Sequence, residues 1–229
     1  MVTANKIISD IRNIATSGSN PIDFRIEDSQ ILYWINEIRS KLISQAIQKK
    51  QDISDTWLQT INCMELIEVD KSECCEIKSN CIILRTKYAI SDTVETTADN
   101  AIIRVETVNA TIISKSTPFE INYNSGNKYT SGKAKWYMKN NYMYIVNNAF
   151  IKYINIIGLF EDPSDLAKYK DCTGNTCFDK NGSYPISLKM ASDITDIVFK
   201  TKILPFIQMI PDNSNNGNNN LNKENTTIQ

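Results

Sequence analysis

The spacing of apolar residues changes twice along this chain of 229 residues. Between about residues 57 and 160, apolar side chains alternate with polar ones, and many of the apolar ones are β-branched or aromatic. On both sides of that stretch, apolar residues recur every three or four positions. A period of two is typical of strands, and a period near 3.6 is typical of helices. The sequence therefore predicts a β-rich middle with helices before and after it.

Seven short runs in the middle stretch are predicted to form antiparallel strands, because Asn, Asp, Gly and Pro separate them. The runs are TWLQTINCMELIEVD, CIILRTKYAI, NAIIRVETV, TIISK, FEINY, KWYMKNNYMYIV and FIKYINIIGLF. Asn140 and Asn141 divide the sixth run, and asparagine tolerates a positive φ better than most residues do. We therefore expect a tight hairpin at these two asparagines.

Two amphipathic helices are predicted before the strands. The first begins after Thr3, which can cap it, and Gly18 supplies a left-handed stop. The second begins with Asp28 or Ser29 as its cap and runs to about Lys50. Its apolar residues form a stripe broad enough to face a core.

Two further helices are predicted after the strands. A short one begins at Pro163 and ends near Lys170, and a longer one begins at Ser187 and ends before Pro205. The predicted fold class is α+β, a helical bundle from the N- and C-terminal helices with an inserted antiparallel β domain and an extended C-terminal arm. The predicted parts are N-terminal bundle helices (1–56), the inserted β domain (57–160), C-terminal bundle helices (161–204) and the interaction arm (205–229).

The composition argues against most kinds of enzyme. The chain has no histidine, which excludes Ser-His-Asp and Cys-His nucleophiles and histidine-ligated metals. None of its seven glycines forms a G-x-G pair, as glycine-rich nucleotide-binding loops require. The formal net charge of −1 provides no overall basic field for nucleic acid or an anionic membrane. We therefore predict a protein that is not an enzyme and that needs no cofactor.

The cysteines allow three interpretations. The first residues lack the pattern of a secretion signal, and no apolar run approaches about 18 residues, so we expect a soluble protein made in a reducing compartment. Free structural thiols are then the favoured interpretation for the six cysteines. The alternatives are a disulfide between Cys172 and Cys177 and a zinc site. The zinc site would draw its ligands from Cys74, Cys75, Cys81, Cys172 and Cys177.

Lysines and aromatic residues are interleaved between residues 128 and 144. Trp136, Tyr137 and Tyr142 could stack on nucleobases or sugars, or hold another ligand. Alternation in a strand pair explains the same pattern, with the aromatic rings packed across strands and the lysines in water. The ligand-binding interpretation predicts that the three rings are exposed in one patch, whereas the strand-pair interpretation predicts that most are buried.

The C-terminal segment combines apolar side chains with Pro205 and Pro211, which keep it extended. The asparagine-rich tail that follows cannot bury enough surface to order itself. We therefore predict that this arm docks on a neighbouring molecule, with packing of residues 203–210 on their own domain as the alternative. The residues predicted to make the contact are Ile203, Phe206, Ile207, Met209, Ile210, Leu221 and Ile228.

Several segments together resemble a known family. They include FRIEDSQILYWINEIRSKLISQAIQKK, CMELIEVDKSECC, NKYTSGKAKWYMKNNYMYIVN and YINIIGLFEDPSD, within roughly residues 4–170. These segments are similar to the adaptor, or ring, proteins that lie beneath the portal in the head-to-tail connector of short-tailed bacteriophages. The similarity is greatest to the ring proteins of crAss-like phages.

The resemblance implies a structural virion protein, assembled in the host cytoplasm, of which about twelve copies form a ring. It further implies that the C-terminal arm reaches the portal protein and that other parts of the subunit face the next ring or a tail protein. DNA would pass through the channel only as cargo, and no membrane would be involved. The alternative functions are a ligand-binding β module of a phage tail and a cysteine-based zinc-binding protein.

Overall fold

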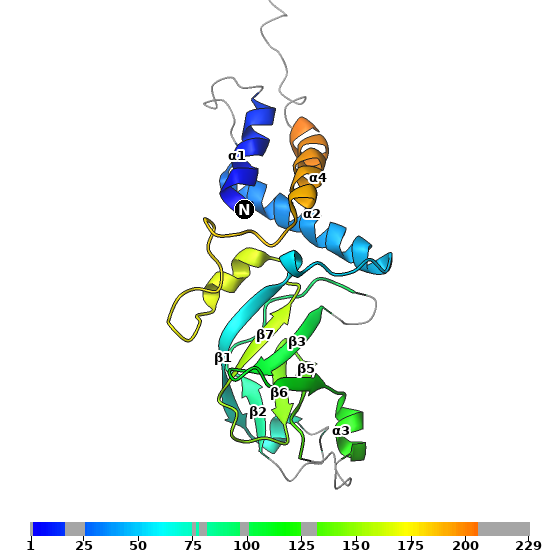
Figure 1. The fold of residues 1–229 in the computed structure, drawn as a ribbon, viewed down its shortest axis with the longest axis vertical. Helices are drawn as coiled ribbons and strands as arrows, with labels where there is room; N and C mark the ends of the chain where they lie inside the picture. Colours follow the sequence, from blue (N-terminus) through cyan, green and yellow to red (C-terminus); the bar gives the residue numbers. More distant parts are fainter. Residues whose placement is uncertain are drawn as a thin grey trace, which may run out of the picture.

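A β-barrel and a group of helices at one end of it make up the structure (Figure 1), a computed structural model that describes residues 2–16, 26–74, 77, 82–96, 101–124 and 132–205. The α-helices are α1 (Ala4–Ala15), α2 (Asp28–Gln48), α3 (Pro118–Asn124) and α4 (Leu188–Val198). The strands are β1 (Gln59–Val69), β2 (Ile83–Thr86), β3 (Ile102–Thr107), β4 (Ile112–Lys115), β5 (Lys135–Lys139), β6 (Tyr142–Val146) and β7 (Tyr153–Gly158). Short 3-10 helices are η2 (Asp55–Trp57), η3 (Lys71–Cys74) and η4 (Pro163–Lys168), and η5 (Phe199–Ile203) is a π-helix.

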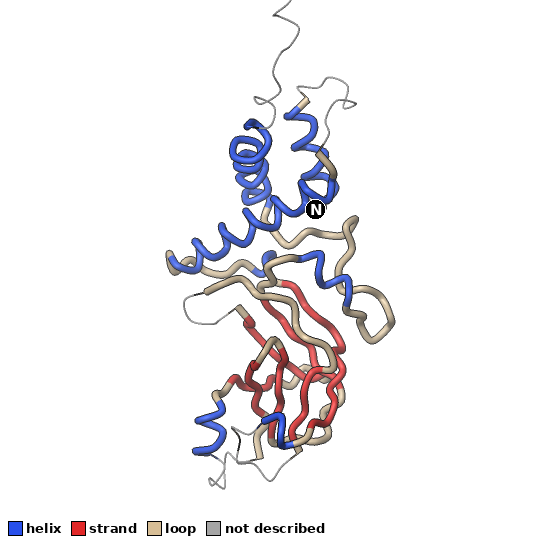
Figure 2. Tube along the Cα trace, turned by 180° about the vertical axis from the view of Figure 1, so that it is seen from behind, coloured by secondary structure: helices blue, strands red, loops and turns tan. Residues whose placement is uncertain are grey.

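The seven strands close into a barrel in the order β1-β2-β6-β5-β4-β3-β7, with β7 paired again to β1. Each neighbouring pair is antiparallel except β4 and β5, which run parallel. Figure 2 shows the strands wrapped around a common interior below the helices. Closure leaves each of the described strands paired on both sides, so these strands offer no long open edge to another chain.

Alternating residues of the strands fill the barrel interior. Ile61 of β1 lies opposite Ile156 of β7, and Trp136 of β5 lies opposite Ile145 of β6. All four side chains are buried in the main core of the protein. The same core continues into the helices, so the two parts share a hydrophobic interior. The period of two that predicts strands is therefore the period with which side chains enter the barrel.

The hairpin predicted at Asn140 and Asn141 is confirmed. These residues join β5 to β6 with φ angles of 50° and 61°, the left-handed region that a tight two-residue turn requires. Ile90 donates its backbone N–H to the Asn141 carbonyl at 2.7 Å, which joins the turn to the neighbouring segment.

Changing Asn140 to valine should lower the free energy of unfolding by about 1–2 kcal/mol, because a β-branched residue resists positive φ. The matched change Asn140→Gly should stay within about 0.5 kcal/mol of wild type. Urea unfolding of the two variants measures the difference. If the two variants had equal free energies of unfolding, backbone strain at this turn would make no contribution to stability.

The run FEINY is predicted as a strand, and that prediction is wrong, because it lies in α3. The hydroxyl of Thr117 accepts a hydrogen bond from the backbone N–H of Glu120 at 3.2 Å, and the Glu120 carboxylate accepts one from the N–H of Thr117 at 3.0 Å. This reciprocal pair is a capping box, and Pro118 occupies the first helical position. The sequence TPFE, residues 117–120, therefore indicates the start of a helix, although the alternating apolar residues of the same run favour a strand.

The predicted helices before and after the strands are confirmed as α1, α2 and α4. Thr3 caps α1 by accepting from the N–H of Lys6, and Ser187 caps α4 by accepting from the N–H of Met190. The predicted cap of α2 at Asp28 or Ser29 is wrong, because its N-cap is Glu27, which makes no side-chain capping hydrogen bond. The short helix from Pro163 is the 3-10 helix η4, with Asp162 as its N-cap.

The predicted fold class is wrong. The body of the protein is a closed seven-stranded barrel with a few short helices, and it is not a helical bundle with an inserted antiparallel β domain. The physical reason lies in what periodicity can report. A period of two identifies residues that face a core, but it carries no information on which strands pair. Barrel closure depends on pairing β1 with β7, almost a hundred residues later, and on the parallel pair β4 and β5.

Candidate functional site

The last α-helix of the described chain, α4, packs against the other helices. α4 contacts both α1 and α2, as Figure 1 also shows. Its inward face consists of small and medium apolar side chains that interlock with the opposing helices. The buried residues of α4 are Met190, Ala191, Ile194 and Val198.

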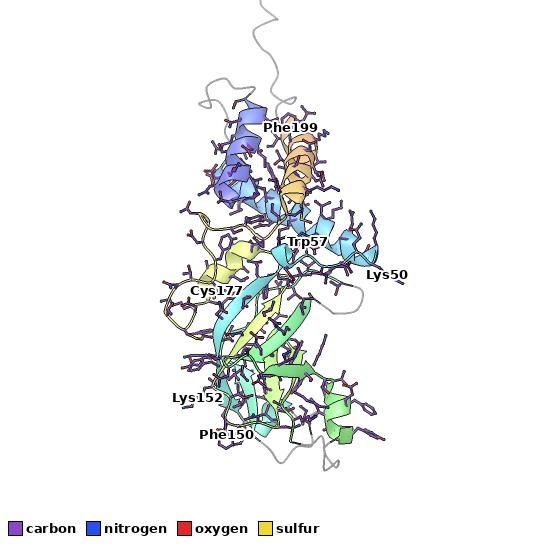
Figure 3. All side chains as sticks on the ribbon, viewed as in Figure 1. Lys50, Trp57, Phe150, Lys152, Cys177 and Phe199 are labelled. Carbon is purple, nitrogen blue, oxygen red and sulfur yellow. A yellow bond between two sulfur atoms is a disulfide. The ribbon has the colours of Figure 1, made fainter. Side chains whose placement is uncertain are left out.

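η5 continues α4 from Phe199, and residues 204–205 after it are the last that the structure describes; Phe199 is labelled near this end in Figure 3. Lys202 forms an ion pair with Glu37 of α2, with 2.8 Å between Nζ and Oε2. Ile203 is fully buried in the main core. The described part of the chain therefore ends two residues after a side chain that is fixed in the core.

The predicted interface residues divide into two groups. Ile203 packs inside its own subunit, in the core that α4 shares with α1 and α2. Six more of the predicted residues lie outside the described residues, and they are Phe206, Ile207, Met209, Ile210, Leu221 and Ile228. Ile203 thus contributes to the core of its own chain.

Arg39 of α2 joins the helices to the barrel. Its side chain is completely buried. Nε donates to the carbonyl of Pro185 at 3.0 Å, Nη1 to Phe160 at 2.8 Å and Nη2 to Trp57 at 3.0 Å. These carbonyls come from the segment before α4, the segment after β7 and η2, and Figure 3 labels Trp57 at the boundary between helices and barrel.

Arg39 keeps its positive charge although its side chain is buried. Desolvation lowers the pKa of the guanidinium to about 10, and nearby Tyr184 and Asp162 act in the opposite direction. Arg39 therefore remains protonated near neutral pH and keeps its donors. Sequence reasoning missed this residue, although a signal was present: it lies four positions after Ile35 and four before Ile43, within the buried stripe of α2.

A second polar chain lies beside Arg39. The Tyr184 hydroxyl donates to the side-chain oxygen of Asn36, and the Asn36 amide donates to Asp162 at 2.7 Å. Asp162 in turn accepts from the N–H of Ser164 at 2.8 Å and caps η4. Burial raises the pKa of the Tyr184 hydroxyl, so it remains a donor. These bonds satisfy polar groups inside the junction and fix the relative positions of α2, η4 and the segment before α4.

A groove of about 530 Å³ runs between α2 and the adjoining segments 92–95 and 161–165. Its walls carry six carboxylates but only one lysine, Lys41. The acidic residues are Glu37, Asp92, Glu95, Glu161, Asp162 and Asp165. Negative charge repels nucleic-acid phosphates, so this face is unsuited to direct contact with DNA.

The cysteine predictions need correction. Cys63 and Cys172 form a disulfide with 5.3 Å between their Cα atoms, so neither is a free thiol, and Cys172 is not bonded to Cys177. Cys63 lies in a bulge of β1 with a φ of 53°, and its N–H donates to the side chain of Asn155 at 3.0 Å. The bulge turns Cys63 towards a segment 109 residues away, a pairing that no sequence spacing indicates.

Cys177 is the free cysteine among the described residues (labelled in Figure 3). Burial raises the pKa of its thiol, and a hydrogen bond from the backbone of Asn62 acts against that rise. The side chains of Cys74, Cys75 and Cys81 lie outside the described part of the chain. Within the described part, His, Cys, Asp and Glu side chains form no group of three or more that could hold a metal ion.

The aromatic residues of the hairpin are mostly buried. Trp136 lies inside the barrel, and Tyr137 stacks on Tyr144 with 5.2 Å between ring centroids. Tyr137 and Tyr144 belong to a second apolar cluster with Ile121 of α3. Tyr142 is only partly exposed. The exposed three-ring patch predicted by the ligand-binding interpretation is therefore absent from these described residues.

Residues 6–221 match a family model of phage tail ring proteins, which places nearly the whole chain in a class of structural phage proteins. The chain belongs to the family of phage tail ring protein 2, from crAss-like phages. The resemblance to crAss-like ring proteins is thus confirmed. No curated protein matches the chain significantly.

Family membership indicates a structural component of the phage virion that forms a homo-oligomeric ring in the tail or connector. Among the described residues, no helix is both long enough and apolar enough to cross a membrane.

Proposed function

We propose that this chain is the subunit of an adaptor ring that joins the portal to the tail in the phage head-to-tail connector. The proposed ring has about twelve copies, and DNA passes through its channel. The C-terminal arm, residues 205–229, is the proposed attachment to the portal. The single observation that carries the proposal is the family match over residues 6–221.

The packing of the residues before the arm supports this role. Ile203 is buried, and Lys202 is paired with Glu37, directly before the first arm residues. A segment that starts from a fixed point loses less freedom when its far end binds a partner. Arg39 connects α2 to the segments after β7 and before α4, and the Cys63–Cys172 disulfide connects β1 to the loop before α4.

Ring symmetry multiplies the effect of each arm. Once one arm has bound the portal, the others are held at a high local concentration near equivalent sites. Linked weak contacts of this kind can exceed a single contact in affinity by about 10²–10⁴. When many arms bind together, the interface between any one arm and the portal therefore does not need to be extensive.

Deletion of residues 206–229 should abolish stable binding to the purified portal protein, with a loss in apparent affinity of about 100-fold or more. The deletion begins after Pro205 because Ile203 belongs to the core. Thermal unfolding should be unchanged. Co-sedimentation and surface plasmon resonance with the portal measure the loss.

A matched control replaces residues 212–220, the asparagine-rich run without apolar side chains, with a Gly-Ser linker of equal length. This variant should retain binding, because the apolar anchors on either side remain. Undiminished portal binding by the deleted chain would remove the arm from the mechanism.

A further inference from the structure

The barrel carries a pair of exposed aromatic side chains on α3. Phe119 is 79% exposed and Tyr123 is 80% exposed. They are four residues apart and therefore lie on the same side of the helix. Ile121, on the opposite side, is buried against the barrel. We call Phe119 and Tyr123 the α3 knob.

A groove of about 430 Å³ lies elsewhere on the barrel, between the β3–β4 turn and the segment from β6 to β7. Phe150, which is 93% exposed, lines it, as do Val108 and Tyr153. Lys152 also lines the groove. We call this feature, defined by Val108, Phe150, Lys152 and Tyr153, the β7 groove.

The knob and the groove lie at the two ends of β4, because the β3–β4 turn comes before this strand and α3 follows it. In the view of Figure 3, Phe150 and Lys152 lie to the left of the barrel and α3 lies to the right. A ring is built from heterologous contacts, in which two unlike surfaces of one subunit meet their complements on two neighbours. Large exposed apolar side chains that gather in patches commonly mark such contact surfaces.

One charged side chain of each surface has the sign opposite to that of the other. Glu120 lies between the two knob residues in sequence, and hydrogen bonds from Thr117 and Ser116, with the nearby charge of Lys135, lower the pKa of its carboxyl, which keeps it ionised. Lys152 is exposed in the groove, and the described part of the chain gives it no carboxylate partner. Complementary charge favours contact between knob and groove and disfavours contact of either surface with itself.

We propose that the α3 knob of one copy packs into the β7 groove of the next copy, and that this contact closes the ring. The inference rests on the proposed function, because it assigns a surface to the ring contact. The aromatic knob rings fill the groove beside Phe150 and Tyr153, and Glu120 faces Lys152 of the neighbour.

Two variants of the full chain separate the surfaces. The knob variant carries Phe119→Ser and Tyr123→Ser, and the groove variant carries Phe150→Ser. Each should fail to form rings alone, with at least a tenfold rise in the concentration needed for association. An equimolar mixture should form dimers that cannot grow, because each variant retains the surface that the other has lost. Native mass spectrometry and sedimentation velocity distinguish these species.

The control variant is Leu188→Ser. Leu188 is 75% exposed at the start of α4, outside both surfaces. It should form rings as the wild type does, and all variants should unfold at the wild-type temperature. Rings formed by either variant alone would overturn the inference, and so would a mixture that stays monomeric.

A cross-linking measurement does not depend on those variants. A photoreactive phenylalanine analogue that replaces Phe150 in an otherwise unchanged ring should cross-link to residues 117–123 of another copy. Cross-links to any other segment would overturn the knob-and-groove contact. Such a result would leave the proposed function intact if the ring still bound the portal, whereas a chain that formed no ring even with the portal would end both proposals.

Discussion

Arg39→Met should lower the free energy of unfolding by about 3–5 kcal/mol. The substitution keeps much of the side-chain volume but removes the donors that bind the carbonyls of Trp57, Phe160 and Pro185. A buried acceptor left without its donor costs about 1–3 kcal/mol. Removing the buried charge recovers some of the free energy that its desolvation costs. The three carbonyls left without donors cost more free energy than that gain. Denaturant unfolding monitored by circular dichroism measures the loss.

Two comparisons test whether the guanidinium itself matters. Arg39→Lys should recover only part of the stability, because an ammonium lacks the planar fork that reaches three directions. Arg104→Met makes the same chemical change at a half-exposed site that is paired with Glu106. It should cost no more than about 1 kcal/mol. A loss below about 1 kcal/mol for Arg39→Met would mean that water or other donors satisfy the carbonyls.

Loss of the Cys63–Cys172 disulfide should lower the free energy of unfolding by about 2–4 kcal/mol. The bond joins β1 to the loop before α4 across 109 residues, so it strongly restricts the unfolded chain. Cys63→Ser and Cys172→Ser should show the same loss, and a reductant should bring the wild type to the same stability. Denaturant unfolding with and without reductant measures these values.

Cys177→Ser is the matched control for the disulfide. Its thiol is half-buried and takes no part in the bond. The variant should stay within about 0.5 kcal/mol of the wild type and should lose stability in reductant as the wild type does. If the wild type and Cys63→Ser unfolded alike under oxidising conditions, the disulfide would contribute nothing to the stability of the folded chain.

Local features of the fold were predictable to the extent that neighbouring residues carry them. Thr3 and Ser187 cap helices by binding backbone groups three residues away, and the two asparagines of the hairpin adopt positive φ within the turn. The capping box at Thr117 and Glu120 is equally local, but the alternating apolar residues of the same run favour a strand.

The features of the candidate site were less predictable, because they depend on residues far apart in sequence. Arg39 binds carbonyls 18, 121 and 146 residues away. The bulge at Cys63 determines which cysteine can reach Cys172, and that bulge follows from the pairing of β1 with β7. Neither the arginine nor the disulfide has a partner that spacing alone could identify.

By itself, the sequence determined where most strands and helices form, which apolar side chains face a core, and the family to which the chain belongs. Local hydrogen bonds and side-chain periodicity are properties of short segments, so they can be read without knowing the rest of the fold. Only the tertiary structure decided that the strands close into a barrel, that Arg39 joins the barrel to the helices, and that Cys63 bonds Cys172. These contacts form only when segments far apart in sequence come together. The free energy of bringing them together depends on the packing of the whole core.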